Sequence, residues 1–175
     1  MDAQEYDELV VPIRQRMVNA IWRITRDAHA TDDVLQDVLV RMLRRFGRIR
    51  RHPNPTALVL RMCVNEAIDH VRRRRRHAVA LEAVRVAEAQ RGGLTGQAEH
   101  AEAREAVLQA LGMLPKREAE AMVLLAVEEL SSRDIAEAMG CRESTVRVLI
   151  SKARKRLRAA LKRGDIALDV EVSES

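Results

Sequence analysis

The sequence predicts an all-α protein made of two small helical domains joined by a flexible linker. Forty-seven per cent of its residues are hydrophobic, yet it has only one Trp, one Tyr and one Phe, so its core must consist of Leu, Val, Ile, Ala and Met. Only 7 Gly and 4 Pro interrupt a chain rich in Ala, Leu, Arg and Glu, and helix propensity therefore dominates. A length of 175 residues suits one ordinary domain or two small ones.

Helical periodicity divides the expected helices into two groups. The first group covers 5–27, 31–46 and 55–76, and the second covers 100–113, 117–130, 132–139 and 143–163. "RHPNP" at 51–55 separates two of these helices, because each Pro removes a backbone donor and restricts the residue before it. Residues 77–98 end in three Gly within five residues and predict a linker that is helical only at its start. The predicted domains are therefore 1–76 and 99–164, followed by an acidic tail at 165–175.

Charge is segregated along the chain. Residues 41–80 hold 12 basic and 2 acidic side chains, and residues 141–164 hold 9 and 1. The segments between and before them are acidic, with 4 basic and 8 acidic residues in 1–40 and 6 and 11 in 81–140. Two separated cationic blocks indicate a polyanion contacted at two places.

Several other classes of protein are not indicated. Cys63 and Cys141 lie far apart without a Cys-x-x-Cys or His partner, so neither a metal site nor a disulfide framework is predicted. The N-terminal "MDAQEYDELV" is acidic, unlike a signal peptide, and no apolar run approaches the roughly 20 residues that span a bilayer. We expect a cytoplasmic protein without a cofactor.

The segment "SSRDIAEAMGCRESTVRVLISKARKRLRAALK" at 131–162 predicts a short helix, a glycine corner and a long basic helix. Ser131 or Ser132 is expected to cap the first helix, and Gly140 forms the corner. On the second helix Val146, Ile150, Ala153 and Leu157 form one narrow stripe, and the opposite side carries Ser144, Val148, Ser151 and Lys155, flanked by Arg147 and Lys152. Such a helix packs on its partner with one side and offers donors to a DNA major groove with the other. The alternative is a helical hairpin with a solvated basic face.

This C-terminal part resembles region 4 of bacterial sigma factors of the sigma-70 family, extracytoplasmic-function group. Leu114-Pro115, Leu130-Ser131, Ile135-Ala136, Gly140, Thr145-Val146 and Ala153-Arg154 fall where the family motif has them. Leu149 departs from the family's frequent polar residue and lies at the margin of the core stripe. The resemblance implies binding of the −35-type promoter element by Arg142, Ser144, Thr145, Arg147, Val148, Ser151, Lys152 and Lys155.

The helix expected over 31–46 has two apolar sets. Leu35, Val38, Leu39, Met42 and Phe46 form a core stripe, whereas Val40 lies opposite it among Asp33, Gln36, Asp37 and Arg44. Val40 is either one of the common isolated exposed valines or part of an interface. Asp32, Asp33 and Asp37 alternatively suggest a metal cluster for an enzyme, but no His or further acid is placed to complete it.

"DDVLQDVLVRML" resembles sigma region 2.2, whose "DLVQE" motif binds the coiled coil of the polymerase β′ subunit. Asp33, Gln36 and Asp37 match that motif position by position. The resemblance implies that the core polymerase contacts Asp33, Gln36, Asp37, Val40 and Arg44. It also implies the β flap as a second polymerase contact, and an anti-sigma factor, which many members of the family have, as a further partner.

The helix expected over 55–76 has a core stripe formed by Ala57, Leu60, Val64, Ala67, Ile68 and Val71. The other side carries Asn65, Glu66, Asp69, Arg72, Arg73 and Arg76, where Asn and Asp suit base edges and Arg suits phosphates. The spacing resembles sigma regions 2.3–2.4, and the loop 47–56 matches in position the segment that captures a flipped-out base. This sequence lacks the usual aromatic before "LRMCVN", so Arg48, Arg50, Arg51 and His52 would hold the strand. The resemblance implies binding of the −10-type element by Arg48, Arg50, Arg51, Asn65, Asp69, Arg72, Arg73 and Arg76.

Taken together, the residues and the resemblance indicate a sigma factor that brings promoter specificity to core RNA polymerase and has no catalytic chemistry of its own. A stand-alone helix-turn-helix regulator is the alternative, and it would need a sensory or dimerising N-terminal domain. A nuclease is a third class, against which the lack of a convergent acid/His constellation argues.

Overall fold

The computed structural model describes residues 3–85, 106 and 109–163 of the chain, and the side chains of 3 and 78–85 lie outside that description. Within these ranges the secondary structure is helical, with no strand. The all-α prediction is confirmed. The elements are α1 (Ala3–Val10), a 3-10 turn (Val11–Ile13), α2 (Arg14–Thr25), α3 (Ala28–Arg50), α4 (Pro55–Arg85), α6 (Lys116–Ala126), α7 (Ser132–Met139) and α8 (Glu143–Lys162).

The first predicted helix, over 5–27, is interrupted in the structure. Residues Val11–Ile13 form a 3-10 turn with Pro12 near its start. The interruption is expected, because Pro has no backbone N–H and its ring clashes with the preceding turn of an α-helix. The single helix predicted across Pro12 was therefore wrong, and α2 ends at Thr25 where Arg26 adopts a left-handed conformation.

The other boundaries follow from local capping. Helix α3 begins earlier than predicted because the side chain of Asp27 accepts a hydrogen bond from the N–H of Ala30 at 3.0 Å, and it continues to Arg50. Helix α4 runs to Arg85, so the predicted linker starts as helix, and 86–98 lies outside the described residues. Helix α6 ends at Ala126, four residues before the predicted end, ahead of Glu129 with its positive φ.

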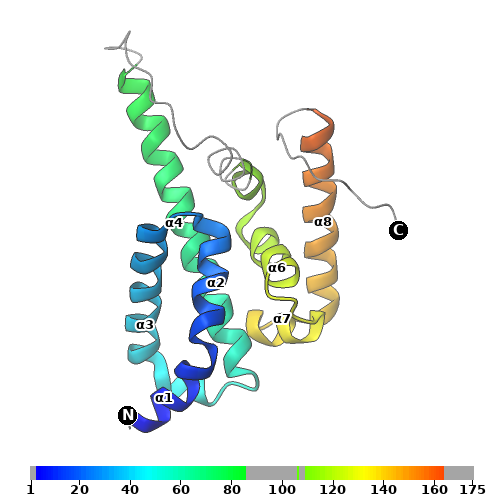
Figure 1. The fold of residues 1–175 in the computed structure, drawn as a ribbon. Helices are drawn as coiled ribbons and strands as arrows, with labels where there is room; N and C mark the ends of the chain where they lie inside the picture. The colour runs from blue at the N-terminus through cyan, green and yellow to red at the C-terminus, as the bar shows by residue number, and fades with distance from the viewer. Residues whose placement is uncertain (1–2, 86–105, 107–108, 164–175) are drawn as a thin grey trace.

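The N-terminal bundle consists of α2, α3 and α4, which pack side by side (Figure 1). Its fully buried side chains include Met17, Ile21, Met42, Leu60 and Ile68. Tyr6 meets Phe46 with ring centroids 5.7 Å apart, which fastens α1 to α3. The core of the bundle consists mainly of aliphatic and methionine side chains, as the low aromatic content of the sequence predicts.

The C-terminal half consists of α6, α7 and α8, with α7 and α8 joined at Gly140. The hydroxyl of Ser131 caps α7 by accepting from the N–H of Asp134 at 3.1 Å. Gly140 ends α7 with φ of 60°, a left-handed conformation in which a side chain is strained. The predicted helix, corner and helix are confirmed.

The two halves pack directly against each other through α4, which contacts both α6 and α7 (Figure 1). One hydrophobic cluster runs through both, from Val10 and Met17 to Ile150 and Ala153. The sequence divides the chain at a linker but does not reveal this contact, because the participating residues lie far apart along the chain.

Candidate nucleic-acid interfaces and an acidic helix face

Helix α8 presents a buried side and a basic side, as predicted. Val146, Ile150 and Ala153 are buried and Leu157 is half-buried. Leu149 is half-buried against the same core, in agreement with its place at the margin of the stripe. Seven of the eight predicted −35 residues are exposed and one, Thr145, is half-buried: Arg142, Ser144, Arg147, Val148, Ser151, Lys152 and Lys155 form the exposed set.

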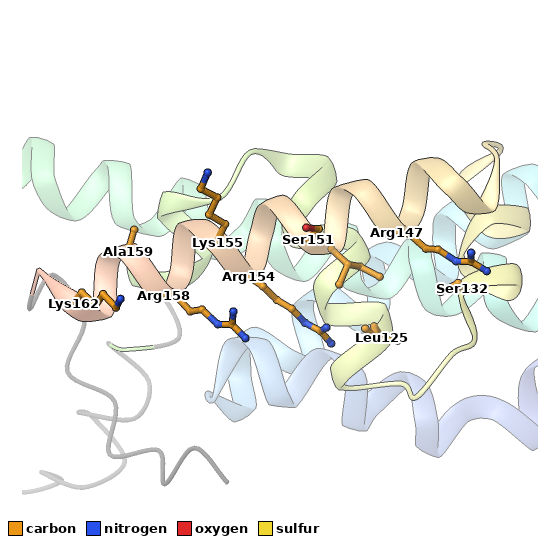
Figure 2. Close-up of a pocket in the computed structure, with 10 residues that line it drawn as sticks. Leu125, Ser132, Arg147, Ser151, Arg154, Lys155, Arg158, Ala159 and Lys162 are labelled. Carbon is orange, nitrogen blue, oxygen red and sulfur yellow. The ribbon is translucent and has the colours of Figure 1, made fainter. Parts of the chain in front are cut away.

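A basic groove along α8 enlarges this surface. It has a volume of about 860 Å³ and extends beyond the predicted residues to Arg154, Arg158 and Lys162 (Figure 2). Ile150 and Leu125 also line the groove. The signal for these additional cations in the sequence is the run "KARKRLRAALK" at the end of the predicted basic helix. Arginine guanidinium groups along a helix suit phosphate oxygens.

The acidic face of α3 is also exposed. Asp33, Gln36, Asp37, Val40 and Arg44 all lie at the surface, opposite the buried Leu35, Val38, Met42 and Phe46. Val40 is 46% exposed, and Leu43, which the sequence analysis did not single out, is 44% exposed. Among the described residues no three His, Cys, Asp or Glu side chains gather as metal ligands would. The apolar pair beside carboxylates favours a protein interface.

Helix α4 is buried on more sides than its periodicity indicated. The predicted stripe of Ala57, Leu60, Val64, Ala67, Ile68 and Val71 is buried, and so are Val59 and Cys63. Burial raises the pKa of the Cys63 thiol far above its usual range, so this cysteine is unreactive. The structure surrounds α4 with α2, α3, α6 and α7.

The predicted −10 residues separate into two groups. Arg48, Arg50, Arg51, Arg73 and Arg76 are exposed. Asn65, Asp69 and Arg72 are half-buried and bond to the C-terminal half: Asn65 to Glu120, Asp69 to Lys116 and Arg72 to backbone carbonyls. Glu66, on the same side of the helix, is buried and pairs with Arg41 at 2.7 Å and Arg73 at 3.4 Å.

The segment between α3 and α4 is shorter than the predicted loop 47–56, because α3 continues through Arg50. Its turn is held by His52, whose Nδ1 accepts from the N–H of Asn54 at 3.1 Å. Asn54 Oδ1 in turn caps α4 by accepting from the N–H of Ala57 at 3.0 Å. Arg48 and Arg50 therefore project from helix rather than from loop, and Arg50 pairs with Glu5.

Glu128 joins the two halves on the side of α2. Its buried carboxylate lies 3.5 Å from the guanidinium of Arg16, and Arg23 donates to the neighbouring carbonyl of Val127. Burial raises the pKa of Glu128, and the charges of Arg16 and Arg23 lower it only in part. The neutral acid is thus favoured in the fold more than in the unfolded chain.

This raised pKa predicts a pH dependence of stability. A carboxyl group with a raised pKa in the folded state contributes stability below its unfolded pKa and loses it as the pH rises through the folded pKa. We expect the free energy of unfolding of the wild type, relative to that of Glu128→Gln, to be larger at pH 5 than at pH 8, so that the wild type gains relative stability at the lower pH. Urea titrations of both proteins at the two pH values measure this. A difference that is the same at both values would contradict the assignment.

Comparisons with known protein families match both helical halves of the chain. Residues 9–77 match the family model for sigma-70 region 2, and residues 104–157 match that for sigma-70 region 4. The chain therefore belongs to the sigma-70 family, with the two regions in the order that the resemblance indicated, and it is a sigma factor that directs transcription initiation with core RNA polymerase on promoter DNA. No curated protein matches the chain in a sequence search.

Among the solved structures that share the fold are two sigma-factor-like chains found in complexes. The sigma factor RpoE from Bartonella quintana, in complex with the anti-sigma factor NepR, has a TM-score of 0.57 and 20% identity, covering 91% of this chain and 98% of that chain. CnrH, in complex with the cytosolic domain of CnrY, has a TM-score of 0.56 and 23% identity, covering 93% and 90%. As for membranes, none of the helices in the described part of the chain combines the length and apolar character of a membrane span.

Proposed function

We propose that the chain uses three separate surfaces to bind core polymerase, the −10 element and the −35 element. The acidic α3 face binds core polymerase, the arginines and polar side chains of α3 and α4 bind the −10 element, and the basic side of α8 binds the −35 element. This assignment rests on the separation of charge in space. An acidic face is exposed on α3, and basic side chains are exposed on α4 and α8. A polymerase and a polyanion require surfaces of opposite sign.

The polymerase contact is assigned to Asp33, Gln36, Asp37, Val40 and Arg44, together with Leu43. Carboxylates around an exposed apolar pair suit a basic, partly apolar helical partner such as the β′ coiled coil. The C-terminal half would meet the β flap. The chain itself would carry out no catalysis and would act in the cytoplasm, where core polymerase is found.

Strand opening is assigned to the end of α3 and the turn that follows it. A flipped base costs a few kcal/mol of unstacking. Arg48, Arg50 and Arg51 are exposed, and His52 is fixed by the turn at Asn54. With no aromatic residue at this place, the cations would hold the melted strand by its phosphates rather than by stacking.

Exposed arginines on α4 and the polar Asn65 on the same helix predict different effects of mutation. Arg76→Ala should weaken promoter binding for all sequences alike and reduce the salt dependence by about one unit of log–log slope. Asn65→Ala should instead change which −10 bases are preferred, because an amide reads base edges. Selection from a randomised promoter library, repeated at several salt concentrations, measures both. An Asn65→Ala protein with wild-type base preferences would remove Asn65 from the reading set.

An anti-sigma factor is the further partner that we propose. Two of the structures with the same fold are complexes, one with the anti-sigma factor NepR and the other with the cytosolic domain of CnrY. The exposed apolar residues Val40 and Leu43 are available to it, so it would compete with polymerase. Competition between core polymerase and a candidate anti-sigma factor for the full chain tests this, and simultaneous binding would contradict it.

A further inference from the structure

Three of the five histidines of the chain line one cavity between α3 and α4. His29 lies in the first turn of α3, and His70 and His77 lie two turns apart on α4. This histidine cavity has a volume of about 560 Å³. None of the three imidazoles belongs to the residues assigned above to polymerase or to the promoter elements.

Charged side chains complete the lining of the histidine cavity. They are two arginines of α4 and two aspartates at the start of α3: Arg73, Arg74, Asp27 and Asp33. These two positive and two negative charges cancel, so the lining is neutral while the imidazoles are neutral and reaches +3 when all three carry a proton. Imidazole takes up its proton between about pH 5 and 8. The charge of the cavity therefore becomes positive as the pH falls through this range.

The nitrogen donors of the histidine cavity are only partly used within the fold. In the described part of the chain, no hydrogen bond or ion pair engages any of the three imidazoles. Arg74 pairs with Asp27 at 3.0 Å. Arg73 lies 3.4 Å from Glu66, which has a closer partner in Arg41 at 2.7 Å. Because a guanidinium carries five N–H donors, both cavity arginines keep donors for a further acceptor.

An anion suits the histidine cavity better than a metal ion. The guanidinium groups repel a cation, and no three His, Cys, Asp or Glu side chains of the described ranges are placed as metal ligands would be. The end of α3 is not itself the binding group, because the N–H of Ala30 already donates to Asp27 at 3.0 Å. Imidazolium and guanidinium donors together match the oxygens of a phosphate, to which they give charge-assisted hydrogen bonds.

The histidine cavity is continuous with the proposed −10 surface of α4. Arg73 belongs to both, and Arg76 is exposed one turn further along the helix. We propose that the histidine cavity is a phosphate-binding site that acts when its imidazoles are protonated. For a phosphate of the promoter backbone this inference rests on the proposed role of α4, whereas a free phosphate ion requires only the cavity.

The first test compares the wild type with the double substitution His29→Gln and His77→Gln in the full chain. Both histidines are exposed, so the fold should be retained, and glutamine keeps a polar side chain that cannot take up a proton. Affinity for a −10 oligonucleotide is measured by fluorescence anisotropy at pH 6 and pH 8, at constant ionic strength. A phosphodiester keeps its charge over this range, so a change of affinity with pH reports protons bound by the protein.

We expect the wild type to bind the oligonucleotide about 3- to 10-fold more tightly at pH 6 than at pH 8, the size that a few solvated ion pairs give. The double substitution should remove most of this increase. At pH 8, where the imidazoles are neutral, the two proteins should bind equally.

His52→Gln serves as the comparison, because His52 follows the far end of α3 and its Nδ1 accepts from the N–H of Asn54. It should leave the difference between the wild type and the double substitution in place. If His52→Gln instead abolishes the pH dependence and the double substitution keeps it, the protons are taken up at that turn and the proposal is overturned for the promoter backbone.

The second test separates a free phosphate ion from the promoter backbone. Inorganic phosphate is added to the full chain at pH 6, with sodium chloride of equal ionic strength as the reference, and the imidazole signals are followed by NMR. The signals of His29, His70 and His77 should move more than that of His52. If they move while oligonucleotide affinity shows no pH dependence, the cavity takes free phosphate and not the backbone.

Flat results in both tests would overturn the proposal and leave the −10 role of α4 intact, provided that the oligonucleotide still binds at pH 8. Failure of the proposed function gives a different result. In that case the wild type would bind no −10 oligonucleotide at either pH, whatever the imidazole signals do on addition of inorganic phosphate.

Discussion

Ile150→Ala is expected to lower the free energy of unfolding by about 2–5 kcal/mol, as large-to-small core substitutions do. Ile150 is 6% exposed and belongs to the core that α8 shares with the rest of the molecule. Any loss of DNA binding by the Ile150→Ala protein should therefore be explained by its smaller folded fraction. Thermal and urea unfolding measure the effect.

Arg147→Ala is the matched change on the other side of the same helix. The Arg147 side chain is 70% exposed and pairs with Glu143 one turn away, so stability should change by no more than about 0.5 kcal/mol. Binding to the −35 element should weaken by about 1–3 kcal/mol, the range of a direct base contact. If Arg147→Ala unfolds the protein while Ile150→Ala spares the fold and abolishes DNA binding, α8 faces DNA with the opposite side.

The double substitution Asp33→Lys and Asp37→Lys is expected to abolish most of the affinity for core polymerase. Both carboxylates are exposed and lie opposite the buried side of α3, so the thermal midpoint should stay close to that of the wild type. Reversal of two interfacial charges turns attraction into repulsion, and like charges that face each other across an interface cost several kcal/mol.

Asp32→Lys is the matched control, since Asp32 is exposed on α3 and adjoins the motif without belonging to it. It should reduce polymerase binding much less than the double substitution. Affinity is measured by titrating labelled chain with core polymerase at two salt concentrations. Wild-type binding by the Asp33→Lys, Asp37→Lys protein would remove the α3 face from the interface.

Local signals predicted α7 and α8 closely. Ser131 as the cap, Gly140 as the corner and the spacing of Val146, Ile150 and Ala153 each depend on residues a few positions apart. Such rules act within one or two helical turns, and a single sequence contains all the information that they need. The exposed side of α8 followed directly from the buried one.

The packing of the two halves could not be predicted in the same way. Glu120 reads as one more surface acid in "KREAEAM", yet it is 2% exposed because Arg61, 59 residues away, pairs with it. Val59 and Cys63 fell outside the predicted stripe of α4 and are buried because four helices surround α4. These are long-range contacts, which periodicity along one helix does not encode. The break at Pro12, in contrast, was present in the sequence as a helix-breaking residue and was missed.

The most direct test of the central claim is transcription by core RNA polymerase that is free of other sigma factors, with the full chain added and a randomised promoter library as template. We expect transcripts that depend on the chain and come from templates sharing two separated elements. Arg147→Ala should relax selection at the upstream element, and Asn65→Ala should alter it at the downstream element. No transcript above that of core polymerase alone, together with tight binding of the isolated chain to one duplex site, would contradict it and identify a stand-alone regulator.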